Sequence, residues 1–244
     1  MKQSLFTIQS NEKLTSSVCK MVLAGDTSAI TAAGQFVNIQ LKGFFLRRPI
    51  SVCDYDENTL TILYKVVGKG TEAMSKMKAP HKLDVLTGLG NGYDTSVSGN
   101  KPLLIGGGVG VPPMYRLAKN LIAEGKHPIM ILGFNTKDEI FYAEEFEKLG
   151  AEVHIATADG SVGVKGFVTD VVKTIPDYTY FYTCGPEPML KALSDVTTTS
   201  GQLSFEERMG CGFGACMGCS CQTKYGNKRI CKDGPVLVKE EIIW

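Results

Sequence analysis

Four cysteines near the C-terminal end of the chain restrict its fold more than any other feature. Cys211, Cys216, Cys219 and Cys231 follow the spacing C-x4-C-x2-C-x11-C. Three thiolates within nine residues can reach one point only if the loop between them folds back on itself. The glycines interspersed in this loop permit that course, because glycine adopts backbone angles that other residues avoid. The spacing therefore predicts a site that gathers thiolates.

The order of these cysteines favours a [2Fe–2S] cluster, since C-x4-C-x2-C followed by a later cysteine is the plant-type ferredoxin pattern. A structural zinc site is the main alternative, but it usually has two separated C-x2-C pairs, and only Cys216 and Cys219 form one here. A disulfide framework fits a chain of 244 residues without a signal peptide poorly. Cys221 is interpreted as a non-ligand, because three ligands already crowd the loop.

Composition indicates a globular chain of one large or several small domains, with 43% hydrophobic and 21% charged residues. A net charge of +1 does not indicate a nucleic-acid partner. No apolar run reaches the roughly 18 residues that cross a bilayer, so no membrane is expected. Without a targeting segment, and with clustered cysteines, the expected compartment is the cytoplasm.

Residues 1–97 alternate apolar and polar side chains in short runs separated by turn residues, which predicts an antiparallel barrel or sandwich. Residues 47–51, Arg-Arg-Pro-Ile-Ser, offer the permanent charge of Arg48 to a phosphate. Residues 68–72, Gly-Lys-Gly-Thr-Glu, precede a short helix whose first N–H groups could bind an anion, with Thr71 as its N-cap. Taken singly, the first motif is better explained by a solvated strand end and the second by a capped helix after a turn.

From residue 98 to 202 the pattern changes to strands alternating with helices, which predicts a doubly wound parallel sheet. Helices are expected from Met114, over residues 138–149, between residues 166 and 173, and over residues 187–196. Ligands of such sheets bind at the carboxyl ends of the strands. Residues 106–110, 158–161 and 184–189 form the loops there, although Pro113 replaces the third glycine of the usual dinucleotide fingerprint.

Together these motifs, in the order R-P-x-S, G-x-G-T, G-G-G-x-G-x-x-P, D-G-S and C-G-P-x-P-M, resemble the ferredoxin reductase family. Residues 206–219 narrow the resemblance to the electron-transfer subunits of NAD-linked dihydroorotate dehydrogenases. The resemblance implies three domains: an FAD-binding β-barrel over 1–97, an NAD-binding α/β domain over 98–202 and a [2Fe–2S] domain over 203–244.

The resemblance also implies which residues bind the cofactors. Arg48 would sit at the FAD pyrophosphate and Ser51 by the flavin ring. The remaining expected FAD residues are Pro49, Ile50, Leu63, Tyr64, Lys65, Gly70 and Thr71. The NAD site would be shaped by Gly108, Gly110, Cys184 and Pro186. The cluster ligands would be Cys211, Cys216, Cys219 and Cys231.

The function that the resemblance implies is an electron relay from dihydroorotate to NAD. No catalytic acid or base is expected, and the three histidines lie in unremarkable contexts. The implied partner is a catalytic dehydrogenase chain that carries FMN, with two copies of each chain. Two alternatives stay open: a stand-alone NAD(P)H–ferredoxin or sulfide-type reductase subunit, and a zinc-stabilised nucleotide-binding regulatory module.

Overall fold

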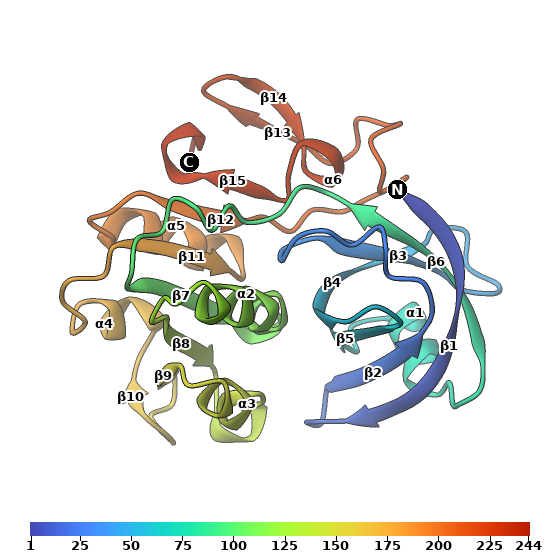
Figure 1. Cartoon of the computed structure of the whole chain (residues 1–244), viewed down its shortest axis with the longest axis horizontal. Coiled ribbons are helices and arrows are strands. Elements are labelled where there is room, and N and C mark those ends of the chain that lie inside the picture. The colour runs from blue at the N-terminus through green and yellow to red at the C-terminus, as the bar shows by residue number, and fades with distance from the viewer.

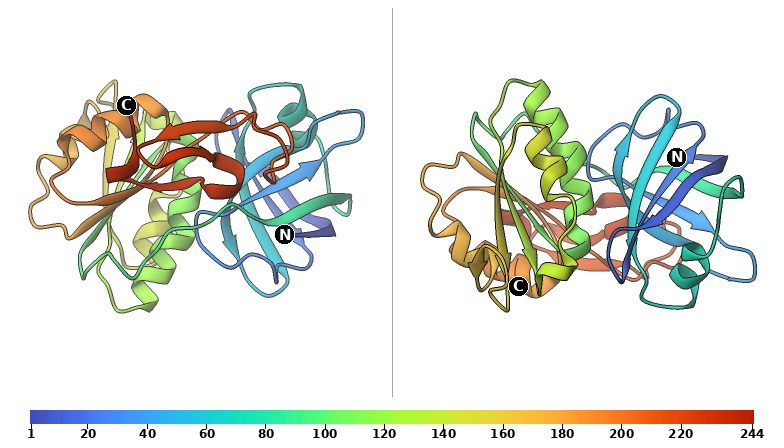
Figure 2. Two further views of the ribbon diagram at one scale, coloured as in Figure 1. Left: turned by 90° about the horizontal axis from the view of Figure 1, so that it is seen from above. Right: turned by 90° about the horizontal axis from the view of Figure 1, so that it is seen from below.

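The computed structural model describes residues 1–244 as two packed bodies bridged by the C-terminal segment. Figure 1 shows the barrel (blue to cyan) beside a sheet with helices (green to orange), and the C-terminal segment (red) lies across both. The two views in Figure 2 show the same arrangement, in which the red segment reaches from the sheet to the barrel.

The first body is a closed antiparallel barrel with strand order β1-β2-β5-β4-β3-β6, which confirms the predicted barrel. Alternate side chains fill its interior, among them Phe6, Leu23 and Ile62, and none of these three is exposed. A short helix, α1 (Lys69–Ser75), follows β5. The strands are β1 (Lys2–Lys13), β2 (Val18–Ala24), β3 (Phe36–Gln40), β4 (Arg48–Tyr55), β5 (Thr59–Lys65) and β6 (Lys82–Leu89).

The second body is the predicted doubly wound sheet, with order β10-β9-β8-β7-β11-β12-β15 and parallel pairing from β10 to β12. The last strand, β15 (Val236–Val238), comes from the C-terminal segment. Its strands are β7 (Pro102–Gly107), β8 (Ile129–Phe134), β9 (Glu152–Thr157), β10 (Val164–Lys165), β11 (Tyr180–Cys184) and β12 (Gly201–Ser204). Its helices are η1 (Gly108–Gly110), α2 (Val111–Ala123), η2 (Lys137–Glu139), α3 (Ala143–Lys148), α4 (Val168–Val172) and α5 (Glu187–Val196).

The helix expected over residues 138–149 is wrong in its first half. A 3-10 turn, η2, occupies its start, and α3 begins only after Tyr142, whose φ of 65° is left-handed. This break turns the aromatic side chains into the core. The ring of Tyr142 lies 5.1 Å from that of Tyr115, and the ring of Phe141 lies 5.3 Å from that of Phe134. Aromatic packing therefore overrides the helical periodicity here.

The C-terminal segment contains β13 (Ser220–Thr223), β14 (Gly226–Arg229), α6 (Ile230–Asp233), β15 (Val236–Val238) and η3 (Lys239–Glu241). Strands β13 and β14 form a hairpin, while β15 pairs antiparallel with β12 at the edge of the large sheet. Strand β12 itself crosses the boundary expected at residue 202. The tail thus shares backbone hydrogen bonds with the sheet and covers its edge, which protects that edge from pairing with another chain.

Helix α2 and strand β4 hold the two bodies together. Arg116 Nη1 lies 3.1 Å from Asp54 Oδ1, and Lys119 Nζ lies 2.7 Å from Asp54 Oδ2. Beside this pair of contacts, one buried apolar cluster includes Cys53 and Leu63 of the barrel as well as Leu117 of α2. The barrel and the sheet are therefore packed against each other through a continuous core. No helix of the protein has the length and apolar character needed to cross a membrane.

Candidate functional site

Two predicted FAD motifs meet where β4 begins and α1 starts. A Cβ atom placed on Gly70 would lie 2.1 Å from Nε of Arg48, so the guanidinium lies directly against the Gly70 backbone. Arg48 donates from Nη1 to the carbonyl of Leu46 at 2.5 Å and lies over the ring of Phe44 at 4.9 Å. No carboxylate pairs with it. A free guanidinium beside the first turn of a helix is a suitable anion site, since both carry positive potential.

Arg47 has a different role from its neighbour. Its Nη2 lies 2.9 Å from Asp84 Oδ1, and its Nη1 donates to the carbonyls of Asn38 and Asp84 at 3.2 Å each. These contacts tie β4 to β3 and β6. Because Arg47 is committed to the barrel, Arg48 alone of the two arginines remains for a ligand.

Thr71 is not the N-cap of α1, contrary to the expectation. Gly68 occupies that position, and Thr71 is the third residue of the helix. The Thr71 hydroxyl accepts hydrogen bonds from the N–H groups of Val67 at 3.0 Å and Gly68 at 3.3 Å. It thereby folds the chain before the helix back onto the first turn, which is the half of a capping box that the third residue supplies. Thr71 shapes the glycine turn that lies under Arg48.

The other expected flavin residues divide between the two faces of their strands. Tyr64 points into the barrel, where its hydroxyl donates to Asn11 Oδ1 at 2.9 Å, so its ring belongs to the barrel core. Leu63 faces the α/β domain, and Lys65 is exposed. Ser51 and Pro49 stand opposite Phe36 and Asn38 of β3. Ile50 packs against the barrel core.

The cysteine loop places the four predicted ligands in two adjacent pairs. The N–H of Cys216 donates to Sγ of Cys211 at 3.3 Å, and the N–H of Cys231 donates to Sγ of Cys219 at 3.5 Å. No three His, Cys, Asp or Glu side chains are grouped closely enough to hold a metal ion. Cys219 and Cys231 are buried, whereas Cys211 and Cys216 are partly exposed.

The electrostatics of the loop differ between the two pairs. Burial acts to raise the pKa of Cys211, but N–H groups from Cys216, Phe213 and Ala215 outweigh it and lower the pKa to about 6. Burial and the neighbouring Cys219 sulfur raise the pKa of Cys231 to about 12. Backbone N–H groups aimed at sulfur are the contacts that stabilise a negatively charged thiolate.

Sequence reasoning missed Asn38, which connects the barrel to the cysteine loop. Asn38 donates from Nδ2 to the carbonyl of Cys211 at 3.2 Å and stands opposite Pro49 in the sheet register. It is a single asparagine in a strand, so only its spatial neighbours reveal its position. The contact joins the strand pair that carries the expected FAD residues to the loop that carries the expected cluster ligands.

The glycine loop and the Cys184 loop lie side by side at the carboxyl edge of the sheet, where Cys184 is in register with Gly106. A Cβ on Gly110 would lie 2.0 Å from the carbonyl oxygen of Cys184, so Gly110 is needed for contact between the loops. Gly108 differs, because its φ is +52° and nothing lies within 4 Å of its missing side chain. It leaves open space beside the 3-10 turn. Pro186 caps α5, and burial raises the pKa of Cys184 to about 12.

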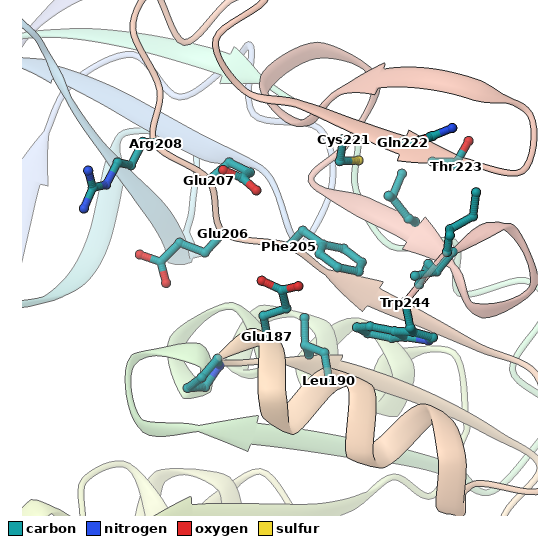
Figure 3. A pocket seen from close by; sticks show the side chains of 14 residues that line it. Glu187, Leu190, Phe205, Glu206, Glu207, Arg208, Cys221, Gln222, Thr223 and Trp244 are labelled. Atoms are coloured by element: carbon teal, nitrogen blue, oxygen red, sulfur yellow. The ribbon is translucent and has the colours of Figure 1, made fainter.

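A pocket of about 550 Å³ lies between α5 and the C-terminal segment. Figure 3 shows Glu187, Glu206 and Glu207 along it, with Phe205 and Trp244 on the apolar side. Cys221 also lines this pocket. The pocket borders the loop of Pro186 but includes none of the other expected FAD or NAD residues.

Comparisons with known proteins agree with this geometry. The family model "Iron-sulfur cluster binding domain of dihydroorotate dehydrogenase B" matches residues 206–243, and "Oxidoreductase NAD-binding domain" matches residues 104–195. The chain is 43% identical to the dihydroorotate dehydrogenase B (NAD(+)) electron transfer subunit of Fusobacterium nucleatum subsp. nucleatum, with 99% of each chain covered. It is 42% identical to the subunit of the same name from Bacillus mycoides, covering 99% of this chain and 98% of the relative.

Among solved structures, an NADH-dependent reduced ferredoxin–NADP oxidoreductase is 29% identical, with a TM-score of 0.88 over 98% of this chain and 90% of that one. A flavohemoglobin from Malassezia yamatoensis, 20% identical, matches with a TM-score of 0.68 over 80% of this chain and 56% of its own. The second likeness concerns the fold alone.

Proposed function

The chain belongs to the family of electron-transfer subunits of NAD-linked dihydroorotate dehydrogenase, and we propose that it performs this role in pyrimidine biosynthesis. Electrons would arrive from a catalytic partner chain and leave to NAD, by way of a [2Fe–2S] cluster and FAD. The observation that carries the proposal is the contact between β3 and the cysteine loop, where Asn38 pairs with Pro49 and donates to Cys211. It supports two cofactors held next to each other.

The cysteine loop fits a [2Fe–2S] cluster better than zinc. The two adjacent pairs, Cys211 with Cys216 and Cys219 with Cys231, suit two irons with two thiolates each. A single zinc ion would need all four sulfurs about 2.3 Å from one point. The lowered pKa of Cys211 favours the thiolate form, which iron and zinc both require, so the preference for iron rests on the order and pairing of the cysteines. The order and pairing of the cysteines therefore favour the cluster over the zinc-stabilised regulatory module.

The FAD site rests on the contact of Arg48 with Gly70. The guanidinium lies against the Gly70 backbone in the first turn of α1, so a pyrophosphate bound beside it would receive charge-assisted hydrogen bonds. Pro49, Ile50 and Ser51 continue from Arg48 along β4. We assign Leu63 and Lys65 to the flavin side through their outward positions. Tyr64 can contribute only through its backbone, because its side chain lies in the barrel.

The NAD site lies at the carboxyl edge of the sheet, between Gly108 and the loop of Cys184 and Pro186. Gly108 leaves space for a pyrophosphate to approach the backbone, and the positive end of α2 lies behind it. Cys184 stays a neutral thiol at physiological pH, since its pKa lies near 12. It would thus form a small uncharged wall beside the nicotinamide. Gly110 holds the two loops together.

FAD, when bound, exchanges electrons with NAD as a hydride and with an iron–sulfur cluster singly. The chain itself needs no proton-transfer group for this. Its residues bind the rings, keep water out and hold the sites at a fixed separation, which the Asp54 contacts with Arg116 and Lys119 help to maintain. Electron relay through cofactors therefore accounts for a site without a catalytic acid or base.

The partner is proposed to be the catalytic chain of a dihydroorotate dehydrogenase that carries FMN, with two copies of each chain assembled. Phe213 and Met217 of the cysteine loop are 43% and 62% exposed. Apolar side chains beside the cluster ligands suit contact with another protein. None of the eight cysteines forms a disulfide, which supports a reducing compartment, the cytoplasm.

Cofactor analysis of the purified chain tests this proposal. We expect two iron atoms, no zinc and one non-covalently bound FAD per chain, together with the visible spectrum of a [2Fe–2S] protein. A colourless chain that contains zinc would instead indicate the regulatory module. The 29% identity to a ferredoxin–NADP oxidoreductase favours a ferredoxin-linked reductase as the second candidate. Reduction of ferredoxin by the isolated chain with NAD(P)H would identify it.

A further inference from the structure

Asn38 is buried against the cysteine loop and is only 1% exposed. It lies on the outer face of the barrel, since its neighbours Val37 and Ile39 point into the barrel core. The single hydrogen bond of its side chain runs from Nδ2 to the carbonyl oxygen of Cys211 at 3.2 Å. Its backbone carbonyl accepts from Arg47, which anchors the strand at this point. Arg47 thus anchors the Asn38 backbone, while the side-chain amide of Asn38 contacts a predicted cluster ligand.

The other end of the Asn38 amide has no partner, because Oδ1 is buried without a hydrogen bond. Rotating the amide would place Oδ1 against the Cys211 carbonyl, where two acceptors would repel each other. Burying an unpaired acceptor costs free energy. An apolar side chain of similar shape, such as leucine, would avoid that cost. The unpaired Oδ1 therefore lowers the stability of the fold at this point, while Nδ2 makes the contact with Cys211.

Gly212 shows how closely the amide approaches the loop. A Cβ on Gly212 would lie 2.3 Å from Asn38 Nδ2, and the φ of Gly212 is +75°. The peptide between Cys211 and Gly212 is therefore fixed from both sides, by its carbonyl bond to Asn38 and by the left-handed glycine. The chain then continues to Cys216, whose N–H donates to Cys211 Sγ at 3.3 Å.

We propose that Asn38 is a positioning residue that fixes the Cys211–Gly212 peptide and thereby raises the reduction potential of the cluster. The inference rests on the proposed function, in which Cys211 is a ligand. Hydrogen bonds around the sulfurs are a main determinant of the potential of such clusters. Reduction adds one negative charge to the cluster. The Asn38 amide compensates the negative end of the Cys211 carbonyl dipole, so it favours the reduced form.

The test replaces Asn38 by leucine in the full chain loaded with its cofactors. Leucine has nearly the same shape, and it removes both the donor and the unpaired acceptor. We expect Asn38→Leu to keep its iron and its thermal midpoint. Its cluster should be about tenfold harder to reduce, which is a fall of about 59 mV for one electron. A redox titration followed by electron paramagnetic resonance measures this potential, and the g-values should also shift.

Asn91→Ala is the matched control. Asn91 also binds the tail through its amide, donating to the carbonyl of Val236 at 2.7 Å and accepting from the Val236 N–H at 3.0 Å. Loosening the tail at Asn91 should lower the thermal midpoint and leave the cluster potential unchanged. If Asn91→Ala shifts the potential as much as Asn38→Leu does, the effect reflects a loosened tail and the proposal is wrong.

Gly212→Ala provides a second route, since its Cβ must push the Asn38 amide away. It should lower the potential in the wild-type background and add little in the Asn38→Leu background, because the two changes remove the same contact. If both single variants contain the cluster and keep the wild-type potential, the proposed role of Asn38 is wrong, while the proposed function is unaffected. A wild-type chain without a [2Fe–2S] cluster overturns this inference together with the proposed function.

Discussion

Replacing Gly70 by alanine should separate FAD binding from stability, because binding should weaken while stability changes little. The new Cβ would lie 2.1 Å from Arg48 Nε and 2.8 Å from its Cζ. Since a relaxed contact is about 3.5 Å, the guanidinium must move by about 1.4 Å. The backbone can accept alanine, because Gly70 has an ordinary helical conformation in α1.

The magnitude follows from the contacts that the guanidinium loses. A hydrogen bond to a charged group contributes about 1.5–3 kcal/mol, so displacing Arg48 should weaken FAD binding by about tenfold to a hundredfold. Alanine in place of glycine in a helix stabilises the fold by about 0.5–1 kcal/mol, which offsets part of the clash. The thermal midpoint of the flavin-free chain should therefore change little.

The assay is titration of the flavin-free chain with FAD, followed by flavin fluorescence. Ser75→Ala, at the other end of α1, is the control, because the Ser75 hydroxyl donates to the carbonyl of Glu72 and makes no hydrogen bond with Arg48. It should bind FAD like the wild type. Arg48→Ala should weaken FAD binding by a similar factor, and the double variant Arg48→Ala/Gly70→Ala should be no weaker than Arg48→Ala. Wild-type affinity in Gly70→Ala would refute the assignment of Arg48 to the pyrophosphate.

Three further predictions concern the cysteines and the domain contact. Cys231→Ser should lose iron while Cys221→Ser keeps it, by iron analysis and visible absorption; the reverse pattern would show that the ligand set is wrong. Asp54→Asn should lower stability in urea by about 1 kcal/mol, because Arg116 and Lys119 lose their shared partner, and an unchanged midpoint would contradict this role. Burial raises the pKa of Cys184 to about 12, so its thiol stays protonated below that pH and iodoacetamide should label it slowly at pH 6–9. Rapid labelling at pH 7, seen by mass spectrometry, would show that Cys184 is not a neutral thiol.

The sequence predicted those features that depend on neighbours along the chain. The alternating strands of the barrel, the stripe of Met114, Leu117 and Leu121 on α2 and the course of α5 are all local patterns, and the structure confirms them. The family resemblance is confirmed as well. The assigned FAD, NAD and cluster residues remain predictions, although the structure brings Arg48 to Gly70.

Features set by distant contacts could not be predicted from the sequence. Tyr142 ends a regular periodic stretch with a left-handed residue because its ring packs on Tyr115 from another helix. The pairing of β15 with β12 joins segments about 35 residues apart and has no local signal. Asn38 looks like any polar residue of a strand until the cysteine loop is placed on it. These long-range contacts determine the relative positions of the expected FAD, NAD and cluster sites.

The measurement that tests the central claim most directly is dihydroorotate oxidation by the chain alone and with its partner. The isolated chain should oxidise NADH with artificial dyes and leave dihydroorotate unchanged. Addition of the FMN-containing catalytic chain should restore NAD-linked dihydroorotate oxidation. The Cys231→Ser variant should lose this coupled activity and keep NADH–dye activity, because only the coupled reaction passes through the cluster. Dihydroorotate oxidation by the isolated chain, or coupled activity without the cluster, would contradict the account.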